Sequence, residues 1–426
     1  MLDKNVIKKL ILEYQDFTSR IEYVPRDIDI DFSRCNVFVG LRRTGKSFLM
    51  YQSIDTLKCE GLDPRSILYF NFEDDRITGI ESSDLDLIKV CYEELYALKP
   101  VFFLDEIQVV PGWEKFARRL ADTGYRVFIT GSNAKMLSSE IATTLGGRYA
   151  LTEVFPFSER EYLVMNAVMP DENWEYRQDT EIRRLFGPYF SLGGLPEVIQ
   201  SADIFKRKWL SSLFDRIYFG DLIARNGIRK QEGLKILIRK MTESIGQPLS
   251  INRMASIAKA AGYPMKSDTA AEYCAAILET WLSFGIENFA GKLTGKSSTR
   301  KYYFIDNGFI TLFKEGQQNA LLENLVAVAL RKKFGRELYY YLHNVEVDFY
   351  IPDRDMAVQA SLTIADDATR QRQVQALCAL HKIRPLRRAL IITYDDPEDI
   401  IRSESGPEIS VVPVWKWLLL ADRQTE

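Results

Sequence analysis

The segment Gly40–Ser47 holds residue types that bind phosphate groups, at the spacing that this chemistry needs. It matches the pattern G-x-x-x-x-G-K-[S/T] in full. Such a loop bends until its backbone N–H groups and the N-terminus of the next helix point at phosphate oxygens. We expect Lys46 to reach the β- and γ-phosphates and Ser47 to ligate Mg²⁺. The residues expected to line the phosphates are Gly40, Arg43, Thr44, Gly45, Lys46 and Ser47.

An acidic pair follows 59 residues after Lys46. The apolar run 101–104 is followed directly by Asp105 and Glu106. Ligands of open α/β sheets bind at the carboxyl ends of the strands, so we expect Asp105 to hold Mg²⁺ from the side opposite to Ser47. We expect Glu106 to orient the attacking water and to accept its proton.

Two further polar residues are candidates for the catalytic site. Ser132, in the turn 130–133, is predicted to sense the γ-phosphate, with Asn133 as the alternative. Arg148 is predicted to supply positive charge to the transition state. For each of them, an ordinary polar turn or surface position explains the residue nearly as well.

Four continuous apolar runs are typical of buried parallel strands. They are 37–39, 67–70, 101–104 and 127–130. Helix-length segments separate them, which predicts an α/β sheet covered on both faces. The strand between the two motifs, together with Glu106, favours the ATPase branch of P-loop NTPases, in which an extra strand separates the motifs. The guanine-reading tetrapeptide N-K-x-D does not occur in the sequence, which argues against a GTPase.

These motifs resemble a family of prokaryotic AAA-like ATPases related to the STAND signalling NTPases. The matching segments are Gly40–Ser47, Asn71–Asp74, Leu104–Gln108, Ile129–Ser132 and Gly147–Tyr149. The resemblance covers nearly the whole chain. It implies that the C-terminal half, an uncharacterised region of the family, is a winged-helix module followed by a restriction-endonuclease-like fold.

We therefore expect three domains. They are a P-loop ATPase domain (1–165), a mostly helical module with a winged helix (166–310) and an α/β nuclease-like domain (311–426). Residues 250–284 show a helix-turn-helix pattern, with Ser250 as the cap of the first helix and the second beginning at 267 or 268.

Contact with DNA is one hypothesis for the middle module. A basic wing is expected at 292–301, and residues 206–240 are rich in Lys and Arg. However, the second helix lacks the Arg, Asn or Gln residues that read base edges, so a packing or protein-interaction role competes with DNA binding. Phosphate contacts without sequence specificity remain open.

The C-terminal module carries acids in the order that a nuclease-like fold would use. The resemblance implies Glu323 and Asp348 as metal-binding acids, on a helix and on a strand that ends near Asp348. Gln359 and Ser361 stand where the next acid and a lysine are expected. Because nucleases of this kind need both, we expect no DNA cleavage, unless a residue such as Lys382 or Arg370 replaces the lysine in space.

The composition limits the classes of protein that the chain can belong to. Its 426 residues are 46% hydrophobic and 27% charged, with a formal net charge of −3, as in folded proteins of two or three domains. Five scattered cysteines and two histidines argue against a zinc site or a disulfide framework. Without a signal-peptide pattern or a long apolar run, we expect a cytoplasmic protein with no membrane contact.

The motifs predict an ATPase that uses ATP and Mg²⁺ and whose nucleotide state switches the arrangement of its domains. In one hypothesis this switch acts on nucleic acid. The alternative is a STAND-like signalling or interaction scaffold with a protein partner and no nucleic-acid binding. Salt-dependent affinity for DNA would distinguish the two.

Overall fold

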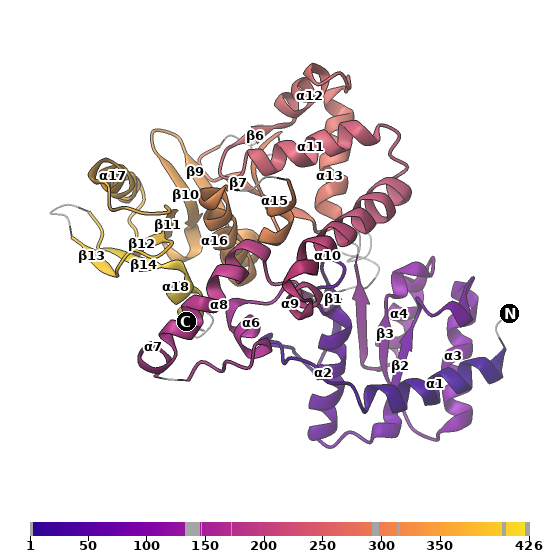
Figure 1. Cartoon of the computed structure of the whole chain (residues 1–426). Coiled ribbons are helices and arrows are strands. Elements are labelled where there is room, and N and C mark those ends of the chain that lie inside the picture. The colour runs from indigo at the N-terminus through magenta and orange to yellow at the C-terminus, as the bar shows by residue number, and fades with distance from the viewer. Residues whose placement is uncertain are drawn as a thin grey trace. The chain divides into compact units, whose positions relative to one another are not determined.

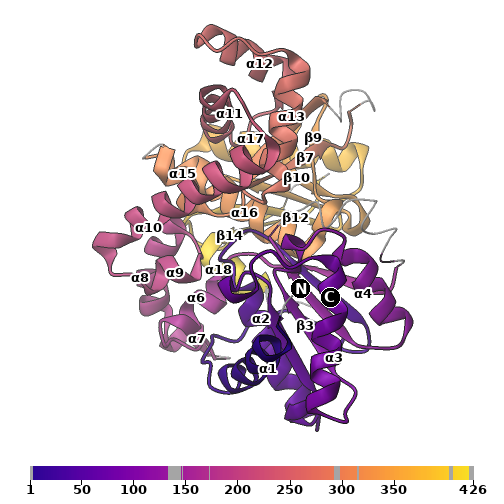
Figure 2. The same ribbon diagram turned by 90° about the vertical axis from the view of Figure 1, so that its right-hand side faces the viewer.

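The structure is a computed structural model that describes most of the chain. The described residues are 3–132, 145, 147–171, 173–291, 298–313, 316–402 and 406–421. The chain divides into an N-terminal unit (1–155 with 279–281) and a C-terminal unit (156–278 with 282–426). Figures 1 and 2 show the N-terminal unit in indigo and purple and the C-terminal unit from magenta to yellow. The three domain ranges expected from the sequence stay predictions.

The N-terminal unit is built on a five-stranded parallel sheet. Its strands are β1 (Cys35–Val39), β2 (Ile67–Asn71), β3 (Val101–Asp105), β4 (Val127–Gly131) and β5 (Tyr149–Glu153). Their order is β2-β3-β4-β1-β5, and every neighbouring pair is parallel. The predicted P-loop NTPase fold is confirmed. The extra strand between the two motifs is β4 in space, whereas β2, which separates them in sequence, lies at the edge of the sheet.

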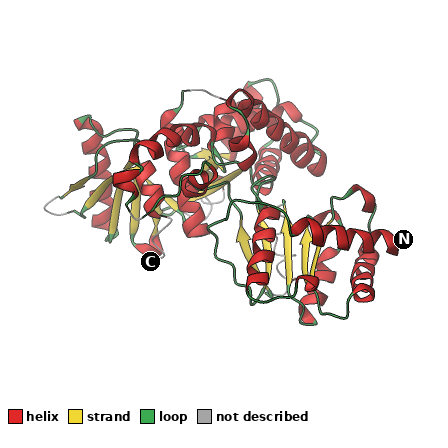
Figure 3. Cartoon of the chain, turned by 60° about the horizontal axis from the view of Figure 1, so that its bottom comes forward, coloured by secondary structure: helices red, strands yellow, loops and turns green. Residues whose placement is uncertain are grey.

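Helices cover both faces of this sheet (Figure 3). They are α1 (Lys4–Thr18), α2 (Lys46–Cys59), α3 (Leu85–Leu95) and α4 (Trp113–Asp122), with short 3₁₀ turns η1 (Pro64–Ser66), η2 (Asp75–Ile77), η3 (Ser82–Asp84) and η4 (Ile107–Val109). Adjacent residues of a strand point to opposite faces. Phe103 stacks on Phe128 in the core beneath α2, and Phe102 contacts Phe116 of α4 on the other face.

The first part of the C-terminal unit is mostly helical, as the sequence predicts for the middle module. Its helices are α6 (Glu159–Met165), α7 (Trp174–Arg177), α8 (Asp179–Leu192), α9 (Pro196–Gln200), α10 (Asp203–Arg216), the π-helix η6 (Ile217–Ala224), α11 (Gln231–Glu243), α12 (Ile251–Ala260) and α13 (Ser267–Glu279). Ser250 caps α12 as predicted, since its hydroxyl accepts the N–H of Arg253 at 3.2 Å. The second helix of the predicted pair begins at Ser267.

A nine-stranded sheet follows, in the order β13-β14-β12-β11-β10-β9-β7-β8-β6. Its strands are β6 (Leu249–Ser250), β7 (Ser283–Asn288), β8 (Thr299–Phe304), β9 (Tyr339–Leu342), β10 (Glu346–Ile351), β11 (Met356–Ala360), β12 (Arg388–Thr393), β13 (Asp399–Ile401) and β14 (Ile409–Pro413). The accompanying helices are α15 (Asn307–Phe313), α16 (Gln318–Phe334), η7 (Gly335–Glu337), η8 (Pro352–Arg354), α17 (Asp367–Ile383) and α18 (Val414–Ala421).

Two sequence expectations for this region need comment. The strand expected to end near Asp348 instead continues to Ile351, because the apolar run after Asp348 keeps pairing with β11. The hairpin of β7 and β8 stands where the basic wing was predicted, but residues 292–297 of that wing lie outside the described residues. The winged-helix and nuclease-like assignments stay predictions. In the described part of the chain, every helix is too short or too polar to span a membrane.

Candidate functional site

The loop between β1 and α2 lies at the carboxyl edge of the parallel sheet. Gly40 begins it at φ +152°, and a Cβ on Gly40 would lie 2.3 Å from the carbonyl oxygen of Val154. Only glycine therefore fits between β1 and the chain that follows β5. Gly45, at φ +93°, ends the loop and precedes the first residue of α2. This geometry aims the N-terminus of α2 at the site where phosphates are expected.

Lys46 is the buried cation of this loop. Its Nζ donates hydrogen bonds to the carbonyl oxygens of Gly40 (3.2 Å) and Leu41 (2.9 Å). Burial lowers the pKa of Lys46. The negative charges of Glu106 and Asp105 partly offset this shift. Thr44 donates its hydroxyl to Leu41 (2.9 Å), and Arg43 adopts a left-handed backbone with φ 65°. The residues predicted to line the phosphates thus form one compact turn.

Asp105 and Ser47, the two predicted metal ligands, lie together. The Ser47 hydroxyl donates to Asp105 Oδ1 at 3.1 Å, and the Tyr69 hydroxyl donates to Oδ2 at 2.6 Å. Thr130 also donates its hydroxyl to Asp105. Burial, followed by the charge of Glu106, raises the pKa of Asp105. A hydroxyl and a carboxylate side by side are oxygen ligands of the kind that Mg²⁺ prefers, so the residues present fit that ion.

Glu106, the predicted base, has a backbone in the left-handed region with φ 53°. Such a conformation costs about 1–3 kcal/mol for a residue other than glycine and is most common at functional sites. Here it is held by the N–H of Glu106, which donates to the Thr130 hydroxyl at 2.8 Å, and by Gln108, whose amide donates to the carboxylate. The carboxylate lies 3.9 Å from Lys46 Nζ, so it faces the phosphate loop.

Ser132 follows β4 immediately, and β4 is the neighbour of β1 in the sheet. Gly131 is paired with Val39, the last residue before the phosphate loop. Ser132 is buried, and among the described residues no group bonds its hydroxyl. A buried polar group without a partner is rare and points to a ligand. Asn133, the alternative sensor, lies outside the described residues.

Arg148 is not brought to the phosphate loop of its own chain. It precedes β5, whose first residue Tyr149 is paired with Cys35 at the start of β1. Because the strands are parallel, Arg148 lies at the amino edge of the sheet and the phosphate loop at the carboxyl edge. Its Nε pairs with Asp122 Oδ1 at 2.5 Å.

Four residues that contact the site were not predicted to do so: Thr130 and Gln108, described above, and also Arg26 and Tyr69. Arg26, which is buried, donates to the carbonyl oxygens of Thr44 and Phe155, both at 2.8 Å, and so ties the phosphate loop to the chain after β5. Tyr69 orients Asp105, as described above. A tyrosine hydroxyl inside the apolar run 67–70 was the one available signal for Tyr69, whereas no sequence pattern marks Arg26.

In the C-terminal unit, Glu323 and Asp348 come near each other, as the resemblance implies, because both lie within 4 Å of Lys301. Arg370, one of the two proposed replacements for the missing lysine, pairs instead with Asp399 at 2.6 Å. Gln359 bonds the backbone of β10 with both ends of its amide.

Comparison with known proteins identifies relatives of this chain. Residues 33–163 match a family described as "AAA domain", and residues 183–318 match a domain of unknown function, DUF8612. The uncharacterized protein MJ1544 of Methanocaldococcus jannaschii is 30% identical, over 98% of this chain and 96% of its own length. An uncharacterized protein of Haemophilus influenzae is also 30% identical, over 80% of this chain and 84% of its own length.

Solved structures show weaker likeness. The Walker-type ATPase PABY2304 of Pyrococcus abyssi has 13% identity and a TM-score of 0.36, over 74% of this chain and 96% of that one. The ORC1 protein of Aeropyrum pernix, solved in complex with DNA, has 14% identity and a TM-score of 0.30, over 77% of this chain and 94% of that one.

Proposed function

We propose that this chain, which belongs to the family of the uncharacterized protein MJ1544 and carries an AAA domain, binds ATP at the phosphate loop and hydrolyses it with Mg²⁺. The observation that carries the proposal is the 3.1 Å contact of Ser47 with Asp105 beside Glu106. It assembles a metal-binding hydroxyl, a metal-binding carboxylate and a base around one phosphate-binding loop.

Binding follows from the loop and its cation. When ATP arrives, the N–H groups of residues 40–47 and the Lys46 ammonium bind phosphate oxygens, and Lys46 exchanges its two carbonyl partners for them. Mg²⁺, when bound, neutralises charge on the phosphate oxygens. Ser47 and Asp105 are the residues that would hold it.

Hydrolysis needs a base that faces the γ-phosphate. The Glu106 carboxylate accepts the proton of the attacking water, while Gln108 holds one of its oxygens. The Ser132 hydroxyl, buried and without a partner among the described residues, donates to the γ-phosphate and reports its presence.

Two substitutions test the proposal. Lys46→Ala should weaken ATP binding by about 100-fold, because a buried charge-assisted hydrogen bond to phosphate is lost. Glu106→Gln should bind ATP normally and lose turnover by roughly 10²-fold or more, because an amide accepts no proton. Binding is measured by fluorescence of a labelled nucleotide, and turnover by phosphate release.

A matched control separates the base from general charge effects. Glu60→Gln changes an exposed glutamate next to α2 and should leave both measurements unchanged. If Glu106→Gln released phosphate at the wild-type rate, Glu106 would not be the base. Scattering in solution with and without ATP, on Glu106→Gln, tests whether nucleotide also changes the arrangement of the two units.

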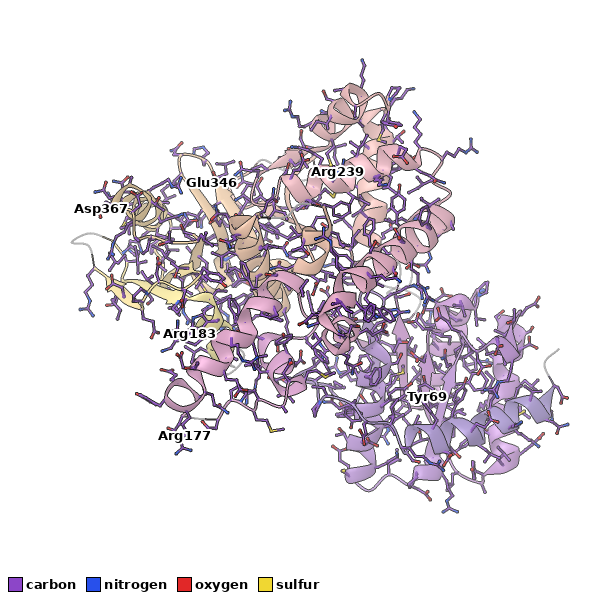
Figure 4. The ribbon with its side chains drawn as sticks, viewed as in Figure 1. Tyr69, Arg177, Arg183, Arg239, Glu346 and Asp367 are labelled. Atoms are coloured by element: carbon purple, nitrogen blue, oxygen red, sulfur yellow. The ribbon has the colours of Figure 1, made fainter. Side chains whose placement is uncertain are left out.

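Exposed residues along one segment of the C-terminal unit, 203–243, support nucleic acid as the partner of this ATPase. Helices α10 and η6 expose the aromatic rings of Phe205, Trp209 and Phe219. Exposed basic side chains of the same region are Lys208, Arg216, Arg225, Arg229, Lys230, Lys235 and Arg239, the last labelled in Figure 4. Exposed rings can stack on bases and exposed cations can bind phosphates, and this segment carries both kinds of group, although it also exposes Asp203, Asp215 and Glu232.

Salt-dependent binding tests this contact. Labelled single-stranded DNA should bind the wild type at low salt, and Lys208→Glu with Arg216→Glu should flatten the dependence of log Kd on log salt by about 2. Lys9→Glu with Lys115→Glu, at exposed positions of α1 and α4, is the charge-matched control. If no salt-dependent binding is seen at low salt, the interaction-scaffold alternative is favoured.

A further inference from the structure

Lys301, in β8, is a fully buried lysine of the C-terminal unit, with 0% exposure. Its Nζ lies 3.1 Å from Glu346 Oε1, 3.4 Å from Asp348 Oδ1 and 3.8 Å from Glu323 Oε1. Glu346, labelled in Figure 4, and Asp348 lie on β10, and Glu323 lies on α16. One ammonium therefore lies among three carboxylates from two other elements. We refer to these four residues as the Lys301 cluster.

The electrostatics of the cluster keep the lysine charged. Burial alone disfavours the ammonium, but the carboxylates of Asp348, Glu323 and Glu346 outweigh it and raise the pKa of Lys301. Burial and the nearby Asp348 carboxylate raise the pKa of Glu323 to about 7. The carboxylates repel one another, and Lys301 is the cation that holds them together.

Further hydrogen bonds hold two of the three carboxylates. The Tyr303 hydroxyl donates to Glu323 at 2.8 Å, and the N–H of Ala360 donates to Asp348 Oδ2 at 3.0 Å. These groups fix the carboxylates in the orientation that faces Lys301. The cluster thus joins β8, α16, β10 and β11.

Gln359, on β11, lies beside the Lys301 cluster and bonds the backbone of the neighbouring strand β10. Its Oε1 accepts the N–H of Asp348 at 3.1 Å, and its Nε2 donates to the carbonyl oxygen of Glu346 at 3.2 Å. A carboxylate at position 359 could not make the second bond, because it has no N–H. The amide is therefore used by the backbone of β10 and adds no negative charge to the cluster.

We infer that Lys301 takes the place of a metal ion, so that the cluster is a closed ionic link that is complete without a divalent cation. Mg²⁺ requires oxygen ligands at about 2.0–2.1 Å in octahedral order, and an ammonium within 4 Å of all three acids occupies the space between them. Across the described residues, no group of three or more His, Cys, Asp or Glu side chains is arranged to hold a metal.

The inference goes beyond ATP hydrolysis and predicts a cation site that only a substitution opens. Lys301→Ala removes the ammonium and leaves space among the acids, whereas Lys301→Met removes the same charge and fills the space. Binding of Mn²⁺ is measured by electron paramagnetic resonance on the full chain without nucleotide. All variants carry Asp105→Asn, which removes the phosphate-loop ligand and so isolates the Lys301 cluster.

The expected result is Mn²⁺ binding by Lys301→Ala and by neither Lys301→Met nor the chain with Lys301 intact. In EDTA, both substitutions should lower the melting temperature by about 10 °C, because the half-buried carboxylates of Asp348 and Glu323 lose their cation. Mn²⁺ should restore part of this loss in Lys301→Ala alone, and a further Asp348→Asn should abolish the rescue.

Two outcomes overturn the inference. One is Mn²⁺ binding by the chain with Lys301 intact that Asp348→Asn removes. The other is a Lys301→Met chain as stable in EDTA as the chain with Lys301. If Lys301→Ala fails to fold, the Mn²⁺ titration of the chain with Lys301 decides: a signal that Asp348→Asn removes overturns the inference, and its absence supports it.

Discussion

Asp105 is held by three hydroxyl groups that come from three different elements: Ser47 of α2, Tyr69 of β2 and Thr130 of β4. Each donates a hydrogen bond to the charged carboxylate, so together they oppose the cost of burying it. Tyr69 is labelled in Figure 4, within the N-terminal unit. Tyr69 and Thr130 lie outside the phosphate loop and the acidic pair, so the proposed metal ligand is positioned in part by side chains outside these two motifs.

Tyr69→Phe removes one of these hydroxyls and keeps the ring. We predict a roughly tenfold lower rate of ATP hydrolysis and a higher Mg²⁺ requirement, because groups that orient a metal ligand typically contribute 10–100-fold. Phosphate release is measured across a Mg²⁺ titration. Tyr51→Phe is the control, since its hydroxyl contacts Tyr69 but not Asp105. An unchanged Mg²⁺ requirement in Tyr69→Phe would contradict the role of its hydroxyl.

Asp306 is a second buried acid, in the C-terminal unit. Its carboxylate accepts the N–H groups of Gly194 (2.7 Å) and Gly308 (2.8 Å), and a Cβ on Gly193 would lie 1.8 Å from Oδ1. Burial raises the pKa of Asp306 to about 6. The folded chain therefore binds this proton more tightly than the unfolded chain, whose aspartates have a pKa near 3.9.

Because its pKa is higher in the folded chain, Asp306 makes the protein more stable at low pH. The stability that Asp306 contributes is fully present below about pH 4 and is lost as the pH rises through 6. Relative to Asp306→Asn, which does not titrate, the wild type should gain about 1 kcal/mol in free energy of unfolding between pH 7.5 and pH 5. Urea unfolding at both pH values measures this difference. If the free energies of unfolding of wild type and Asp306→Asn differed by the same amount at both pH values, Asp306 would have an ordinary pKa.

Three of the residues that sequence patterns missed share one property: their partners are far away along the chain. Tyr69 bonds Asp105 across 36 residues, Arg26 bonds Phe155 across 129, and Lys301 contacts Asp348 across 47. Motif spacing reports only local geometry. It therefore located Lys46, Ser47, Asp105 and Glu106 together, but not the side chains that hold them in place.

At the scale of elements, the strands of the N-terminal sheet differ in burial, and this difference explains which of them the sequence predicts. β1, β2, β3 and β4 were predicted because each is a continuous apolar run, as in strands buried on both faces. β5 was missed because its residues Tyr149–Glu153 are half-buried and polar in part, as an edge strand allows. The parallel pair of β7 with β9 was also missed, since no local pattern specifies a pairing between Glu287 and Tyr339, which are 52 residues apart.

The close contact between Gly40 of the phosphate loop and Val154, which follows β5, can be tested by substitution. Gly40→Ala should abolish ATP binding and lower the melting temperature, because its Cβ would lie 2.3 Å from the Val154 carbonyl oxygen and push the loop from β5. Gly187→Ala, inside α8 with open space around it, is the control and should be neutral or slightly stabilising. Thermal unfolding and nucleotide binding are the two measurements. Normal ATP binding by Gly40→Ala would contradict the close contact.

At the scale of the whole molecule, the position of Arg148 bears on assembly. It lies at the amino edge of the N-terminal sheet and pairs with Asp122, so it cannot reach the phosphate loop of its own chain without a large rearrangement. The prediction that Arg148 acts on ATP therefore requires the nucleotide of a second copy of the chain. Arginines that act in this way contribute roughly 10³–10⁵ in rate.

Mixing two inactive variants tests this arrangement. Arg148→Ala keeps Glu106, and Glu106→Gln keeps Arg148, so a mixed oligomer contains complete sites and the mixture should regain ATP hydrolysis. Mixing Glu106→Gln with Lys46→Ala should regain none, because both residues belong to the same chain's site. If Arg148→Ala alone hydrolysed ATP within about twofold of the wild type, Arg148 would have no such role.

The pairing of β7 with β9 determines which fragments of the chain can fold on their own. Glu287 is in register with Tyr339, and Asn288 with Tyr340, so the hairpin of β7 and β8 and the strands after residue 338 share one sheet. A fragment ending between β8 and β9 would expose the backbone donors and acceptors of β7, and a bare strand edge recruits other chains into aggregates. A fragment ending just after Phe155 instead keeps the acceptors of Arg26 and the contact of Gly40. Expressed separately, residues 1–155 should therefore stay soluble and unfold cooperatively, whereas a fragment ending between β8 and β9 should aggregate.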